Sequence, residues 1–291
     1  MSKAISANLV VNLVGAVAAT LVVGWVIYSM RESDAPQICE GRYPSSTRFS
    51  LTGPQGKALS DSELQARLGL SEWGILDNGE IVRDESAPVS PVLEVRIAKG
   101  TGSGFNTTIP RGGISFQWSP FEMSEQAPQS ACLSYHVFLP EDFQFAGTGS
   151  LPSLFVGRDF DPRGETMKGG GSAARVGWLR DGRATVSLQY ASKDGWVNPE
   201  IVATNTQWPL GRWVAVEQEV ILNSIGKRDG IVRLWFDGQF AGESKGVALR
   251  NKSDLSLGGV LADVQYGSVN NVGTAPKGTK VRMTPFVIRW K

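Results

Sequence analysis

The stretch GRWVAVEQEVILNSIGKRDGIVRLWFDG, residues 211–238, decides the fold of this chain. From Val214 it alternates between apolar and polar side chains, which is typical of a strand with one buried and one solvated face. A second apolar run, Ile231–Phe236, ends at Asp237-Gly238, a pair that favours the positive φ angles of a type I′ hairpin turn. The stretch therefore predicts strands joined by tight turns.

Short strands of the same kind are expected from Val92 to the end of the chain, with Asp181-Gly182 as a second type I′ turn. The chain has 291 residues, among them 34 glycines and nine tryptophans. Glycine-rich turns between short aromatic strands favour an all-β sandwich or barrel. The expected strands are Val92–Ala98, Gly113–Trp118, Ala131–Leu139, Ala173–Arg180, Arg183–Ala191, Trp213–Leu222, Ile231–Phe236, Gln239–Ser244, Leu255–Tyr266 and Val281–Trp290.

The N-terminal residues 1–30 predict a membrane anchor. No charged residue lies between Lys3 and Arg31, and residues 9–28 are almost wholly apolar. A helix of about 20 residues spans the hydrocarbon core of a bilayer, and Trp25 and Tyr28 sit where interfacial aromatic residues belong. A cleaved signal peptide is the alternative interpretation.

Basic residues flank this segment almost equally, and Lys3 with the terminal amine places the N-terminus in the cytoplasm. We therefore expect a single-pass protein of the inner (plasma) membrane, with its main domain in the periplasm or outside the cell. Residues 31–90 form a lead-in segment with one short helix, because Ser60-Asp-Ser-Glu63 is a capping-box pattern.

Two cysteines, Cys39 and Cys132, form a disulfide if the domain is exported, and two unpaired thiols are the alternative. No C-x-x-C spacing is present, so we expect no metal and no cofactor. The net charge of +1 gives no electrostatic reason to expect nucleic acid as a partner.

Three stretches, residues 133–154, 173–182 and 211–238, resemble polysaccharide lyase family fourteen and, more distantly, the glucuronan lyases. The resemblance covers roughly residues 92–290. It implies a jelly-roll β-sandwich in residues 91–291, like that of the alginate lyases, whose concave sheet cradles an acidic sugar chain. The expected fold is thus all-β, a jelly roll preceded by one N-terminal transmembrane helix.

Lyases of this kind cleave by β-elimination. The reaction requires a cationic or amide group near the uronate carboxylate and a Tyr, Lys or His side chain that transfers protons. The family uses a lysine, a serine, an arginine and a pair of tyrosines. The resemblance places these roles at Ser150, Ala173, Arg175, Ser187 and Gln189. Arg175 alone keeps the family residue, so the resemblance implies substrate binding by Arg175, Gln189, Ser187 and Ser150 more directly than catalysis.

Other side chains complete the set of candidates. His136, the one histidine, has an ordinary pKa of about 6.5 that suits a general base, and Tyr190 is a second candidate for proton transfer. Gln117, beside Ser115, is expected to line a sugar groove. Trp196 and Trp208 are candidate stacking platforms, whereas the strand residues Trp178, Trp213 and Trp235 are expected in the core.

The leading hypothesis is a membrane-anchored, extracytoplasmic polysaccharide-binding protein of lyase-like fold, accessory to exopolysaccharide synthesis or export. It would bind the membrane through residues 9–28 and work beside a polysaccharide synthase or export complex. The alternative is an active lyase that cleaves a uronic-acid-containing polymer. The third hypothesis is a structural subunit of a membrane complex.

Overall fold

The computed structural model describes residues 16–25, 36–69, 72–104, 108–123, 128–157, 159–160, 167–168, 171–192, 195–196, 200–267 and 273–291. The chain divides into two units, Met1–Gln37 and Ile38–Lys291. Every strand described lies in the second unit. That unit is the domain considered below.

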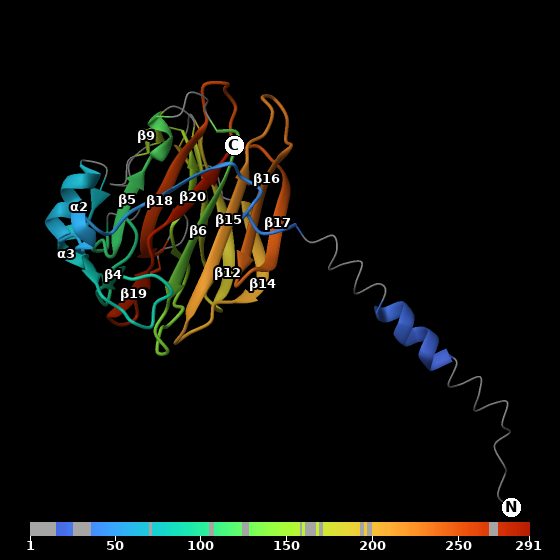
Figure 1. Cartoon of the computed structure of the whole chain (residues 1–291), viewed down its shortest axis with the longest axis horizontal. Helices are drawn as coiled ribbons and strands as arrows, with labels where there is room; N and C mark the ends of the chain where they lie inside the picture. The colour runs from blue at the N-terminus through green and yellow to red at the C-terminus, as the bar shows by residue number, and fades with distance from the viewer. Residues whose placement is uncertain are drawn as a thin grey trace, which may run out of the picture. The chain divides into compact units, whose positions relative to one another are not determined.

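All strands described except β9 and β10 belong to two nine-stranded antiparallel sheets (Figure 1). The first sheet has the order β17-β16-β15-β6-β19-β4-β3, and β20 joins β6 to β1. Its strands are β1 (Ser45–Arg48), β3 (Gly79–Val82), β4 (Val92–Ile97), β6 (Ser130–Phe138), β15 (Trp213–Ile221), β16 (Gly230–Phe236), β17 (Gln239–Val247), β19 (Thr279–Met283) and β20 (Val287–Trp290).

The second sheet has the order β13-β12-β11-β7-β18-β5-β2, with β14 beside β12 and β8 between β11 and β18. Its strands are β2 (Glu72–Trp73), β5 (Ile114–Trp118), β7 (Gly149–Ser150), β8 (Ser153–Val156), β11 (Ser172–Trp178), β12 (Arg183–Ser192), β13 (Gly195–Trp196), β14 (Glu200–Gln207) and β18 (Leu257–Tyr266). A separate pair is formed by β9 (Asp159–Phe160) and β10 (Met167–Lys168).

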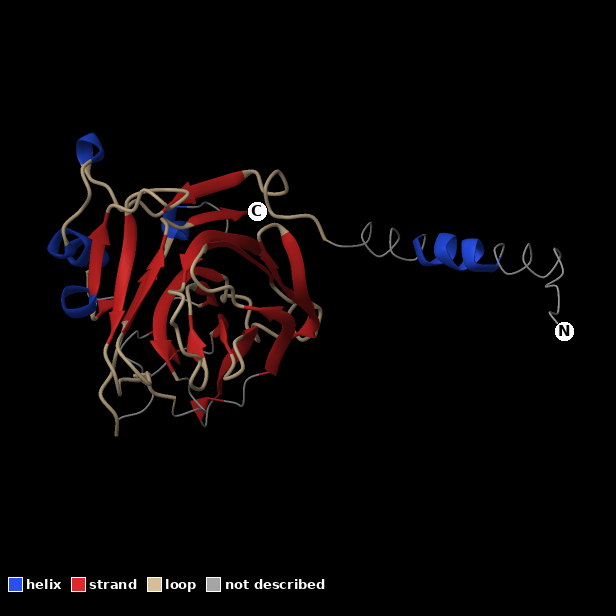
Figure 2. Cartoon of the chain, turned by 90° about the horizontal axis from the view of Figure 1, so that it is seen from below, coloured by secondary structure: helices blue, strands red, loops and turns tan. Residues whose placement is uncertain are grey.

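The short helices of the domain gather mostly along one side of the strands (Figure 2). They are η1 (Pro54–Gly56), α2 (Asp61–Leu68), α3 (Ile75–Asn78) and η2 (Pro120–Met123). The predicted capping box starts α2, because the Ser60 side chain accepts the Glu63 N–H and the Glu63 carboxylate accepts the Ser60 N–H.

The core lies between the two sheets, because alternate residues of each strand are apolar and buried. In the first sheet Val214 and Val216 of β15 point inward, and in the second sheet Val176 and Trp178 of β11 do so. The predicted antiparallel β-sandwich is therefore confirmed.

The two predicted hairpin turns differ. Asp237 and Gly238 have φ angles of 48° and 75°, as a type I′ turn requires. At the other turn only Gly182 has a positive φ, and the Leu179 N–H donates to the Arg183 carbonyl. A three-residue loop therefore replaces the predicted type I′ turn there, because Arg180 adds a residue.

Other strands depart from the sequence prediction. The expected strand Val281–Trp290 is two strands, β19 and β20, separated around Pro285, which has no N–H for a sheet ladder. Residues 200–207 form β14 instead of a loop. The lead-in segment supplies β1, β2 and β3, so it is built into both sheets.

Residues 16–25 form a helix whose apolar side chains, such as Leu21 and Trp25, are each 69% exposed. Within the described residues, no helix is both long and apolar enough to cross a membrane. The flanking parts of the predicted anchor, residues 1–15 and 26–30, lie outside the described residues.

A disulfide and a buried carboxylate fasten the lead-in to the first sheet. Cys39 is bonded to Cys132 of β6, with 6.1 Å between their Cα atoms. The buried carboxylate of Glu219 on β15 accepts hydrogen bonds from Arg42 at 2.7 Å and from the Tyr43 hydroxyl at 2.5 Å. These contacts lie on the face of the sheet away from the core.

We expect the double variant Cys39→Ser/Cys132→Ser to lose about 2–4 kcal/mol of unfolding free energy, because the bond constrains a long loop of the unfolded chain. The loop is closed across a sequence separation of 93. Urea unfolding under oxidising conditions measures this loss. Reduced wild-type protein is the control and should match the variant. Equal stability of oxidised wild type and variant would contradict the expectation.

Candidate functional site

Polar side chains line the face of the second sheet that is turned away from the core. In β11, Val176 and its alternate neighbours belong to the core, so Arg175 points to the opposite face. The same alternation in β5, β7, β12 and β18 places further polar residues there. We call this surface the Arg175 face; its members are Ser115, Gln117, Ser150, Arg175, Ser187, Gln189, Asp263 and Gln265.

Most of these side chains are buried although they lie outside the core. Arg175 is 3% exposed, Asp263 2% and Gln189 1%. Charged and amide side chains are rarely buried so completely unless they have partners. The Arg175 face is therefore an enclosed polar site and not a solvated sheet surface.

A row of side chains crosses the Arg175 face from strand to strand. Trp73 of β2 pairs with Ser115 of β5, and Ser115 pairs with Asp263 of β18. Farther along, Arg175 of β11 pairs with Ser187 of β12. Directly paired residues of an antiparallel sheet lie on one face. The row thus runs between two half-buried ends, Trp73 and Ser187.

Arg175 is held at the centre of this row by two side chains. Its guanidinium forms a salt bridge with Asp263, and its Nε donates to Oε1 of Gln189 at 2.5 Å. Nε2 of Gln265 donates to the same oxygen of Asp263 at 3.1 Å. Charge-assisted hydrogen bonds in a buried setting are strong and directional. The guanidinium therefore has a fixed position.

Three buried polar atoms of the Arg175 face have no hydrogen-bond partner among the described residues: Nε2 of Gln189, Oδ1 of Asp263 and Oε1 of Gln265. Each such atom costs about 1–3 kcal/mol when nothing pairs with it, and buried polar groups are generally paired. One donor and two acceptors are therefore available here to a ligand or to water.

Two side chains of the first sheet cross the core and bind the backbone of the second sheet beneath the Arg175 face. Gln218 of β15 accepts the Leu154 N–H at 2.8 Å and donates to the Ala174 carbonyl at 2.5 Å. The Tyr135 hydroxyl of β6 donates to the Pro152 carbonyl at 2.9 Å. These bonds fall at and beside the break between β7 and β8. The first sheet thus positions the backbone beneath the site.

The sequence profile of polysaccharide lyase 14 matches residues 85–284, more than half of the chain. The chain belongs to polysaccharide lyase family 14. The match includes all eight members of the Arg175 face. Comparison with curated protein sequences gives no match.

Solved structures of lyases share the fold of this family member. A family 14 alginate lyase from Aplysia kurodai matches with a TM-score of 0.68 and 18% identity, covering 86% of this chain and 99% of its own. Alginate lyase vAL-1 from Chlorella virus gives 0.57 and 17%, covering 73% and 89%. Alginate lyase Aly36B in complex with an alginate tetrasaccharide gives 0.59 and 16%, covering 86% and 98%.

The structure brings together five residues expected from the sequence of this family member. Arg175, Gln189, Ser187, Gln117 and Ser150 all lie on the Arg175 face, as defined above. Register explains this, because β11 pairs Arg175 with Ser187 on β12 and Gly177 with Ser150 on β7.

Two other candidates are described in their backbone alone. Tyr190 pairs with Ser172 in the ladder of β11 and β12, and Trp196 pairs with Ala191 in that of β12 and β13. The side chains of Tyr190 and Trp196 lie outside the described residues.

His136 does not share a face with Arg175. It lies on β6 of the first sheet, where it pairs with Ala215 and where the alternate residues Tyr135 and Val137 fill the core. Burial lowers the pKa of His136 below its ordinary value of 6.5, against the opposing attraction of Asp237. His136 is thus a half-buried residue on the outer face of the opposite sheet.

Trp208, expected as a stacking platform, is a core residue. It is 3% exposed, its Nε1 donates to the Gly177 carbonyl at 2.9 Å, and its ring packs edge-on against Phe236. The loop before β15 therefore folds this indole inward. Trp178 lies in the core as expected. Trp235 is buried outside that core, against Tyr43 and the disulfide, and Trp213 is half-buried and donates to Ser86.

Sequence reasoning missed Asp263, Gln265 and Trp73. Asp263 and Gln265 alternate with apolar residues along β18, and this period of two was the available signal for a polar face. Trp73 sits in a two-residue strand, too short for any periodicity, and Arg111 lies 4.1 Å from the centre of its ring.

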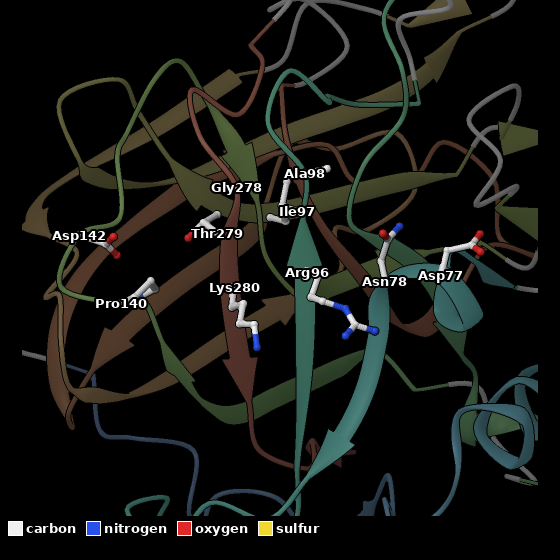
Figure 3. A pocket seen from close by; sticks show the side chains of 10 residues that line it. All are labelled: Asp77, Asn78, Arg96, Ile97, Ala98, Pro140, Asp142, Gly278, Thr279 and Lys280. Carbon is white, nitrogen blue, oxygen red and sulfur yellow. The ribbon is translucent and has the colours of Figure 1, made fainter.

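A separate cavity of about 620 Å³ is lined by residues from α3, β4, β19 and the loop after β6 (Figure 3). Its two cations are Arg96, which pairs with Glu80, and Lys280, which pairs with Glu94. Both cations are about half exposed, so water screens them. The Arg175 face, with buried and unpartnered polar atoms, is the stronger candidate site.

We expect Gln218→Met to lower the unfolding free energy by about 2–4 kcal/mol, because two buried backbone groups lose their partners. Urea unfolding checks this value. Gln239→Met, at an exposed position of the hairpin, is the matched control and should leave stability unchanged. A loss as small as that of the control would show that Gln218 does not stabilise the backbone beneath the Arg175 face.

We expect His136 to make stability depend on pH. Its pKa is lower in the folded state, so the unfolded state binds more protons and the unfolding free energy falls as the pH drops through 6.5. His136→Gln should weaken this dependence between about pH 7.5 and pH 5.5. Unfolding curves across that range give the result, and identical slopes for both proteins would refute it.

Proposed function

We propose that this chain binds a uronic-acid-containing polysaccharide on the Arg175 face and cleaves it by β-elimination. The observation that carries the proposal is the buried cluster around Arg175, with unpartnered polar atoms, in a chain of polysaccharide lyase family 14. Similar structures include Aly36B with bound alginate tetrasaccharide and trisaccharide, which supports a glycan as the ligand.

The proposed reaction removes the proton at C5 of the sugar, breaks the bond between C4 and its glycosidic oxygen, and forms a C4–C5 double bond. The leaving oxygen takes up a proton. As the proton leaves C5, negative charge develops on the carbonyl oxygen of C6, the acyl carbon bonded to C5. The Arg175 guanidinium and Nε2 of Gln189 are donors that suit this charge, because buried donors stabilise it more than water does.

We expect Arg175→Gln to reduce the rate of cleavage by about 10²–10³-fold, the usual effect of removing a donor to a developing oxyanion. The full chain is incubated with alginate and with esterified alginate, and the ultraviolet absorbance of the unsaturated product gives the rate. Arg289→Gln, on the outer face of the first sheet, is the control and should keep the wild-type rate. An undiminished rate for Arg175→Gln would refute the proposed site.

A second candidate function is binding without cleavage, as an accessory to exopolysaccharide synthesis or export. The described side chains of the Arg175 face include no Tyr, Lys or His, the groups that usually transfer protons. Ser150 and Gln189 occupy positions where the family resemblance implies a lysine and a tyrosine. Polysaccharide binding without any absorbance increase would favour this function. Family membership favours the lyase.

We also propose that residues 9–28 anchor the chain in the plasma membrane, with the domain outside the cytoplasm. The support is the uncharged apolar sequence and the exposed apolar side chains of residues 16–25. Such a location suits work on a polymer as it emerges from the cell. Retention of the chain in membranes after alkaline extraction would support the anchor, and full release would refute it.

A further inference from the structure

We infer that the sugar unit held at Arg175 and Asp263 carries no charge. The inference rests on the proposed function, because it concerns the same face and the same polysaccharide. It departs from the resemblance, which implies an acidic sugar chain at this position.

The charges at the centre of the Arg175 face cancel. Arg175, the cation there, is 3% exposed, and it forms its salt bridge with Asp263, which is 2% exposed. A substrate carboxylate placed against Arg175 would also lie against the Asp263 carboxylate. Two like charges in a buried site cannot both remain ionised without a large cost. Asp263 thus offsets the charge of the guanidinium, so the pair does not favour the full charge of a bound carboxylate, whereas the Arg175 N–H groups can still donate to a neutral acyl oxygen.

The hydrogen-bonding groups that have no partner also favour hydroxyl groups over a carboxylate. The unpartnered atoms are two acceptors, Oδ1 of Asp263 and Oε1 of Gln265, and one donor, Nε2 of Gln189. A carboxylate can only accept, so it cannot satisfy either oxygen. A sugar hydroxyl donates and accepts, so neighbouring hydroxyls can satisfy both oxygens and the amide. The free groups therefore match sugar hydroxyls and do not match a carboxylate at this position.

Two kinds of sugar have this chemistry: a neutral hexose, and a uronic acid whose carboxyl group is esterified. The second is compatible with β-elimination at a centre where the charges of Arg175 and Asp263 cancel. An ester makes the C5 proton more acidic than a carboxylate does, so no extra cation is needed to neutralise the group before the proton leaves. The two sources share the property that the site recognises, and they differ in whether they can be cleaved.

The test compares three polymers of similar backbone, each titrated into the full chain in a calorimeter at one ionic strength. They are alginate, the propylene glycol ester of alginate, and a neutral mannan. We expect the ester, the mannan or both to bind at least about tenfold more tightly than alginate. Binding of the ester alone identifies an esterified uronate. Binding of mannan alone identifies a neutral hexose, which supports the inference and overturns the proposed cleavage.

A charge variant tests the role of Asp263 directly. Asp263→Asn removes the negative charge beside the guanidinium, so affinity for alginate should rise about tenfold relative to wild type. Asp84→Asn is the matched control, because Asp84 also pairs with an arginine, Arg282, but on the first sheet. It should leave the affinities unchanged. The wild-type comparison of the three polymers needs no variant and stands if Asp263→Asn fails to fold.

The outcomes separate this inference from the proposed function. Tighter binding of alginate than of both uncharged polymers would overturn the inference and leave polysaccharide binding intact. No rise in alginate affinity in a folded Asp263→Asn variant would also count against it. Failure to bind any of the three would overturn the proposed function, and the inference with it.

Discussion

Arg175 and Asp263 meet across the break between β7 and β8, on the side of the second sheet away from the core. Both side chains are buried, and removing one partner of a buried ion pair typically lowers the unfolding free energy by about 3–5 kcal/mol. The contact fixes β11 against β18 on one side of the sheet, while Gln218 and Tyr135 tie the other side to the first sheet. The polar site and the hydrophobic core therefore depend on the same few strands.

The fold of this chain and the charge of its polar face have different origins. The sandwich is that of the alginate lyases, and the family is polysaccharide lyase 14. The charge at the centre of the Arg175 face is set locally, by Asp263. If the Arg175 face binds sugar as proposed, this one carboxylate decides whether the arginine accepts a charged or an uncharged unit.

The sequence predicted where strands lie along the chain better than it predicted which strands pair with one another. Alternation along β15 and the Asp237-Gly238 turn gave the sandwich, because local periodicity and turn chemistry act within a few residues. Alternation also assigns Gln189 and Ser187 to one face. It cannot tell which strands become neighbours, so the Arg175–Asp263 contact, 88 residues apart, was not foreseen. His136 attracted attention by its chemistry, yet the pairing of β6 with β15 places it in the opposite sheet.

The central claim is that the Arg175 face holds the polysaccharide. A crystal structure of the full chain with a manno-oligosaccharide, and one with an esterified alginate oligosaccharide, test it most directly. The account predicts that sugar hydroxyls lie within hydrogen-bond distance of Oδ1 of Asp263 and Nε2 of Gln189. Sugar bound instead in the cavity beside Arg96 and Lys280, with those two atoms still without a sugar partner, would contradict it.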